Sequence, residues 1–146
     1  MSNPLVKFGV GAAGYCLITV PLAYIWHLVA FKSTYESLGY FSREEPIVAF
    51  GFGAILIQGL LLSWIFPRLC RGKAFSAGAA PLLIVMGTYH WSMHVLAEAA
   101  KHQIEPLSRW FVLESTYLAI QFFLGGCWLA LVYRGQQSVE ERADVT

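Results

Sequence analysis

The chain has 146 residues, of which 57% are hydrophobic and only 13% are charged. This composition excludes an ordinary soluble domain, in which about a quarter of the residues carry a charge. A formal net charge of +1 and the absence of any run of basic residues give no reason to expect a nucleic-acid partner. The composition predicts instead a protein whose main partner is the lipid bilayer.

Four stretches of the chain have the apolar length, roughly 20 residues, that a helix needs to cross a bilayer. They run from Phe8 to Phe31, from Pro46 to Phe66, from Phe75 to Ala100 and from Leu107 to Tyr133. We therefore predict an all-α integral membrane protein, a four-helix bundle of up-down topology. One four-span transmembrane domain would occupy residues 1–135, and residues 136–146 would form a polar, frayed cytoplasmic tail.

The distribution of Lys and Arg predicts the orientation of these spans. Arg68, Arg71 and Lys73 follow the second span with no acidic residue among them, Lys7 precedes the first span, and Arg134 follows the fourth. Basic residues favour the cytoplasmic side of a membrane, so both termini should be cytoplasmic. The small size and short loops favour the inner membrane of a prokaryote.

The first span contains Pro21, which should kink it, and a histidine close to its outer end. His27 precedes Lys32 by five residues, which places it roughly 8 Å below the outer boundary. Tyr24 and Trp26 are near neighbours of His27 in the sequence. Either residue could hold the imidazole in a fixed orientation through a hydrogen bond.

The third span carries two histidines, His90 and His94, at a spacing of four residues. This spacing stacks their side chains on one helix face, where a pair of imidazoles can chelate one metal ion. His94 precedes Lys101 by seven residues and should lie roughly 10 Å deep, with His90 one turn deeper. Trp91 is a second candidate to hold an imidazole in place.

The fourth span contains a carboxylate, Glu114, seven residues after Leu107 and thus roughly 10 Å deep. A charge in the middle of a membrane helix costs roughly 2.5–3.5 kcal/mol, so such a residue indicates a functional site by default. Tyr117 and Gln121 follow on the same helix face, and Gln58 of the second span lies near the bilayer middle.

Three spans thus carry imidazoles and a carboxylate to a similar depth near the outer leaflet. We predict that these groups bind a transition-metal ion, either zinc, copper or iron. The predicted ligands are His27, His90, His94 and Glu114, and the residues expected around the cofactor are Tyr24, Trp26, Gln58, Trp91, Tyr117 and Gln121.

Three other functions are compatible with the same residues. A haem could be bound between facing helices by His27 with His90 or His94. Glu114 and His90 could act as a catalytic acid–base pair, as in an isomerase that acts on a lipid-like substrate. The chain could also be a non-catalytic accessory subunit of a larger membrane complex, or a homo-oligomer, whose polar residues serve packing. Whether the protein is an enzyme is left open by the sequence.

Overall fold

A computed structural model describes residues 3–41, 43, 45–69 and 75–143 of the chain. Helices make up these residues almost entirely, and no strand occurs among them. The elements are α1 (Pro4–Tyr24), η1 (Ile25–Ala30), α2 (Lys32–Ser37), α3 (Val48–Leu69), α4 (Phe75–Trp91), η2 (Ser92–Leu96), α5 (Ala97–Lys101) and α6 (Leu107–Ala143). The predicted all-α class is confirmed for this part of the chain.

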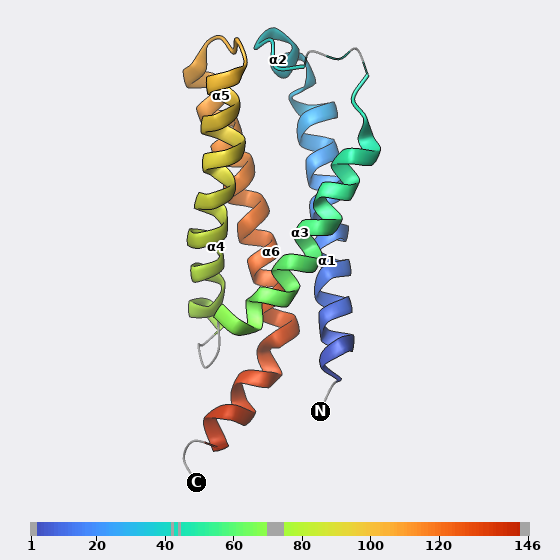
Figure 1. Ribbon diagram of the computed structural model, residues 1–146, viewed down its shortest axis with the longest axis vertical. Coiled ribbons are helices and arrows are strands. Elements are labelled where there is room, and N and C mark those ends of the chain that lie inside the picture. Colours follow the sequence, from blue (N-terminus) through green and yellow to red (C-terminus); the bar gives the residue numbers. More distant parts are fainter. Residues whose placement is uncertain (1–2, 42, 44, 70–74, 144–146) are drawn as a thin grey trace.

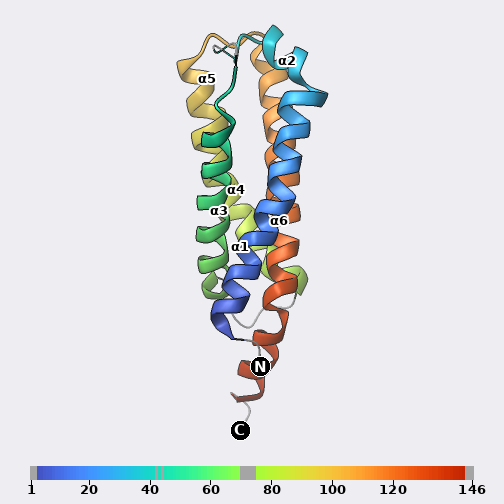
Figure 2. The ribbon, with the colours of Figure 1, turned by 90° about the vertical axis from the view of Figure 1, so that its right-hand side faces the viewer.

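The long helices run along the long axis of the molecule, and α3 is tilted relative to α1 and α6 (Figures 1 and 2). The described helices form four rods. The first consists of α1 continued by η1, and the second is α3. The third consists of α4 continued by η2 and α5, and the fourth is α6. α1 packs against both α3 and α6, and α4 packs along α6, whereas α3 and α4 contact each other little. Both termini lie at one end of the molecule, and α2 and α5 lie at the other, which we call the α2/α5 end (Figure 1).

Three helical segments are long and apolar enough to cross a membrane: Pro4–Ala30, Val48–Leu69 and Leu107–Arg134. Large apolar side chains such as Phe50, Leu61 and Trp64 are exposed on the outside of α3, as contact with lipid requires. The predicted third span falls on the continuous helical rod from Phe75 to Lys101. A fourth crossing by this rod stays a prediction, and Arg71 and Lys73, used for the orientation, lie outside the described residues.

The close contact between α1 and α6 depends on glycine. The indole Nε1 of Trp128 donates to the carbonyl of Gly11 at 3.1 Å. A Cβ placed on Gly14 would lie only 2.1 Å from the ring of Trp128. A larger residue at position 14 would therefore separate the two helices, because small residues set how closely helices approach in lipid.

Two helix ends differ from the sequence prediction. α3 continues past Phe66 to Leu69 and includes Pro67. Pro67 lacks the N–H that would bond the carbonyl of Ser63, and the hydroxyl of Tyr133 donates to that carbonyl at 2.8 Å instead. α6 continues through the expected frayed tail to Ala143, since that segment is rich in the strong helix formers Gln, Glu and Arg.

Candidate functional site

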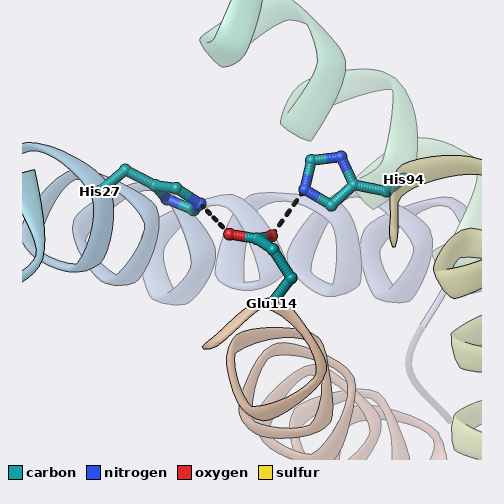
Figure 3. A group of neighbouring side chains, drawn as sticks. All are labelled: His27, His94 and Glu114. Carbon is teal, nitrogen blue, oxygen red and sulfur yellow. Dashed lines mark hydrogen bonds and ion pairs between the residues drawn. The ribbon is translucent and has the colours of Figure 1, made fainter. Parts of the chain in front are cut away.

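The site is built around Glu114, whose side chain projects from α6 and is fully buried. Its carboxylate lies between two imidazoles, one from η1 and one from η2 (Figure 3). Nε2 of His94 is 2.7 Å from Oε2 of Glu114, and Nε2 of His27 is 3.5 Å from Oε1. The ligand atoms of all three residues lie within 4.8 Å of one another, so this group could hold a metal ion.

Both histidines lie in π-helical segments rather than in ordinary α-helix. In η1 the amide of Phe31 donates to the carbonyl of Trp26 at 3.0 Å, five residues back. π-helical turns are rare in proteins, and those that occur are often found at functional sites. The wider turn shifts the direction of each side chain relative to an α-helix, and here both wide turns carry an imidazole that meets Glu114.

His90 lies outside this three-residue group. Its ring packs 5.5 Å from the ring of His94 and 5.6 Å from the ring of Phe122, measured between centroids. The structure thus brings together three of the four predicted ligands and places His90 beside them. Between His90 and His94 the chain changes from the α-helix α4 to the π-helix η2. The two imidazoles therefore do not follow the regular α-helical spacing that the sequence prediction assumed.

The hydrogen bond at the other nitrogen of His27 determines what Nε2 can do. Nδ1 of His27 lies 2.9 Å from the backbone carbonyl of Ala23. A carbonyl only accepts, so Nδ1 carries a hydrogen and donates it. In a neutral ring Nε2 then turns its lone pair toward the carboxylate of Glu114, which also only accepts. The two atoms need a cation between them, either a proton or a metal ion.

Tyr35 completes the surroundings of the carboxylate. It lies in α2, is fully buried and donates its hydroxyl to Oε1 of Glu114. The indole of Trp26 donates in turn to the Tyr35 hydroxyl at 3.2 Å. Burial, with a further contribution from Glu114, raises the pKa of Tyr35 well above its ordinary value, which keeps the hydroxyl available as a donor.

Tyr35 was not among the predicted site residues, because it lies in the short segment between two apolar spans. A usable signal was present. Tyr35 comes only eight residues after His27, so a chain that turns back at the end of the span returns it to the level of the histidine.

The other predicted cofactor neighbours have different surroundings. Tyr117 is buried and presents its ring edge-on to His27, with the centroids 4.5 Å apart. Trp91 donates to the hydroxyl of Ser115 at 2.8 Å and so joins α4 to α6. Tyr24 is 55% exposed and lies on the outer side of α1. Tyr117 therefore packs directly against His27 of the three-residue group.

Gln58 and Gln121 belong to a separate polar cluster deeper in the bundle. Nε2 of Gln121 donates to the Tyr15 hydroxyl at 2.8 Å and to Oε1 of Gln58 at 3.0 Å. Tyr15 also donates to Gln58, at 3.1 Å. The three side chains satisfy one another and join α1, α3 and α6, which is the usual role of buried amides between membrane helices.

Two imidazoles and one carboxylate form the ligand set of many catalytic zinc sites and of non-haem iron sites. Ligand atoms of one tetrahedral ion lie roughly 3.4 Å apart, given bonds of about 2.0–2.2 Å, so the His27–Glu114 separation of 3.5 Å fits. The Glu114 carboxylate lies between the imidazoles of His27 and His94 (Figure 3), and haem binding by the histidines stays a prediction. Comparison with known proteins found no matching family model, curated protein or solved structure.

Proposed function

We propose that this protein binds one transition-metal ion, Zn²⁺ or Fe²⁺, in the membrane through His27, His94 and Glu114. The observation that carries the proposal is the hydrogen bond from Nδ1 of His27 to the carbonyl of Ala23. This bond is the arrangement that metal-binding imidazoles commonly use, because it fixes the tautomer and aims the free lone pair at the ion.

The charge balance of the site supports the same proposal. Glu114 is fully buried, and an ionised carboxylate in hydrocarbon is expensive unless a positive charge accompanies it. A divalent ion would supply that charge and would draw η1, η2 and α6 together. Tyr35 would hold the carboxylate in position through its hydrogen bond to Oε1 of Glu114.

Three protein ligands leave at least one coordination position open. Open positions are typical of catalytic rather than structural sites. A bound ion would act there as a Lewis acid or would activate a bound water. In this proposal His27 is the ligand whose tautomer the chain fixes, and Tyr35 is a positioning residue for Glu114.

The membrane placement is part of the proposal. The rod from Phe75 to Lys101 would form the fourth crossing, and the site would lie close to the outer leaflet. Termini at the same end of the molecule agree with an even number of crossings (Figure 1). The basic residues near that end support a cytoplasmic location for both termini, in the inner membrane of a prokaryote.

Metal analysis of the protein purified in mild detergent tests the proposal. We expect about one ion per chain in the wild type, and loss of the ion in His27→Gln and His94→Gln. His90→Gln is the matched control, because its ring lies next to His94 but outside the three-residue group. Metal-free wild-type protein, or equal metal content in all four proteins, would contradict the proposal. Circular dichroism would confirm that each variant keeps its helices.

A metal-free acid–base site is the second candidate, and one distance favours it. The 2.7 Å separation between His94 and Glu114 is that of a direct charge-assisted hydrogen bond and is shorter than the spacing of two ligands on one ion. In that case His94 and Glu114 would share a proton and exchange it with a bound lipid-like molecule. Metal-free protein that loses turnover of such a molecule in Glu114→Gln would support this candidate.

A further inference from the structure

Two polar side chains at the middle of the bundle keep hydrogen-bonding groups that no described residue uses. The cluster of Tyr15, Gln58 and Gln121 occupies the Oε1 atom of Gln58, and it leaves Nε2 of Gln58 without an acceptor among the described residues. The imidazole of His90 packs against neighbouring rings and has no hydrogen-bond partner in the same part of the chain. Both side chains are half-buried, so part of each is still accessible from outside the bundle.

The two groups border the same turn of α6. Nε2 of Gln121 donates to Oε1 of Gln58 in α3 at 3.0 Å. The ring of the next residue of α6, Phe122, lies 5.6 Å from the ring of His90 in α4, measured between centroids. Since α3 and α4 contact each other little, neither group is covered by the helix that carries the other. One turn of α6 thus brings an unused amide and an unused imidazole to one level of the bundle.

This level is the middle of the apolar segments. Gln58 lies ten residues after the start and eleven before the end of Val48–Leu69, and Gln121 lies fourteen and thirteen residues from the ends of Leu107–Arg134. In a bilayer whose hydrocarbon core is about 30 Å thick, the middle of a span lies about 15 Å from either headgroup region. Phospholipid headgroups therefore do not reach these groups, and a donor without a partner in hydrocarbon is costly.

We propose that Gln58 and His90 form a binding site, the Gln58/His90 site, for an uncharged, lipid-soluble carbonyl compound of the quinone type. The depth selects an uncharged molecule, because an ionised group at the middle of a bilayer is expensive. The unused groups select hydrogen-bond acceptors, since the Gln58 amide donates and a neutral imidazole donates through one nitrogen. The two carbonyl groups of a quinone supply one acceptor for each donor, and its apolar tail dissolves in the surrounding hydrocarbon. This binding goes beyond the proposed metal site and does not depend on it.

The chain offers matched variants for both contacts. Gln58→Met removes the free amide and also breaks the bonds of its cluster, whereas Gln121→Met breaks bonds of the same cluster and leaves the Gln58 amide in place. A difference between these two variants therefore reports the free amide and not the packing of the cluster. His90→Phe keeps an aromatic ring and removes both ring nitrogens. Tyr89→Phe is its control, because Tyr89 is the neighbouring residue and is 65% exposed.

The test is binding of decylnaphthoquinone to delipidated protein in detergent, followed by native mass spectrometry over a range of concentrations. We expect Gln58→Met and His90→Phe each to weaken binding about fivefold, as expected for the loss of one hydrogen bond. Gln121→Met and Tyr89→Phe should bind within about twofold of the wild type. Equal binding by His90→Phe and the wild type, or equal weakening by Gln58→Met and Gln121→Met, would overturn the proposal.

Two further molecules test the chemical class of the ligand. Decylnaphthalene has the same rings and tail without the carbonyl groups, and it should bind to the wild type about tenfold more weakly than decylnaphthoquinone. Equal binding of the two molecules would mean that the site accepts any apolar molecule, and would overturn the assignment to a carbonyl compound. Displacement of decylnaphthoquinone by phosphatidylglycerol at equal concentration would overturn it as well.

Metal content measured on the same samples separates this inference from the proposed function. His90→Phe should keep the metal content of the wild type, because His90 is not in the three-residue group. Weaker quinone binding with unchanged metal content supports the Gln58/His90 site. If the wild type holds no metal but binds decylnaphthoquinone in a way that depends on Gln58 and His90, this site stands and the metal site fails. A wild type that holds metal but does not bind decylnaphthoquinone would give the opposite result.

Discussion

His94 and Glu114 are joined at 2.7 Å although 20 residues and a reversal of the chain separate them. The same carboxylate approaches His27 through its other oxygen, so one side chain of α6 links to both π-helical segments. The site and the packing at the α2/α5 end therefore depend on the same contacts. Variants of the site are expected to change stability as well as ligand binding.

Glu114→Gln should remove the metal and lower stability together. The amide keeps the size of the side chain, but it cannot offer two anionic oxygens to the imidazoles and to Tyr35. A buried donor left without its partner costs about 1–3 kcal/mol. We expect metal loss together with a lower thermal midpoint in detergent, measured by circular dichroism. Unchanged metal content in this variant would contradict the role of Glu114 as a ligand.

Tyr35→Phe tests the positioning of the carboxylate. The variant keeps the ring that stacks on His27, with centroids 5.0 Å apart, and removes the hydroxyl that donates to Glu114. Loss of an outer hydrogen bond to a metal ligand typically weakens metal binding about 10- to 100-fold. Tyr24→Phe is the control, because Tyr24 is 55% exposed. Competition with a chelator of known affinity would measure the difference, and equal affinities would exclude a positioning role.

Gly14→Ala should destabilise the contact between α1 and α6. The added Cβ would lie 2.1 Å from the Trp128 ring, a distance that real atoms do not tolerate. Overpacking of this kind costs about 1–3 kcal/mol. Gly9→Ala is the control in the same helix, since its Cβ meets nothing within 4 Å. Thermal unfolding followed by tryptophan fluorescence should show a lower midpoint for Gly14→Ala alone.

Tyr40 should make the protein sensitive to alkaline pH. Burial, with smaller contributions from the Glu114 and Glu98 carboxylates, raises the pKa of Tyr40 from 10.0 to about 12. Between these values the folded protein keeps a proton that the unfolded chain releases, so the stability contributed by this group falls as pH rises. Tyr40→Phe should flatten the decline in stability across that range. A tyrosinate absorbance that titrates fully near the ordinary pKa in the folded protein would contradict the prediction.

The sequence predicted the long helices because apolar length alone determines them. It also predicted that His27, His90, His94 and Glu114 meet, and the structure groups three of these four residues, His27, His94 and Glu114. The count of residues from each helix end gave these three residues similar depths, and the structure brings their ligand atoms together. A carboxylate within an apolar helix is costly without a partner, and imidazoles on neighbouring helices at the same depth were the available partners.

The rest of the site could not be predicted from helical spacing. A period of 3.6 residues groups His90 with His94, but the chain changes from α-helix to π-helix between them. Local residue preferences do not predict a π-helical turn, because its formation depends on tertiary contacts. The association of Gln58 and Gln121 with Tyr15 depends on which helices face each other, and residue spacing along one helix does not contain that information.

The wide turns at η1 and η2 make the number of residues as important as their identity. A deletion of one residue within Ile25–Ala30 would let the backbone return to ordinary α-helical bonding. Everything that follows would then rotate by about 100° relative to α1, because each residue of an α-helix advances by that angle. Such a shortened chain would keep its hydrophobicity and its span, yet the aromatic hydroxyl that follows in α2 would turn away from the carboxylate. Single-residue insertions and deletions in these two short segments are therefore the changes that would separate membrane insertion from the chemistry of the site.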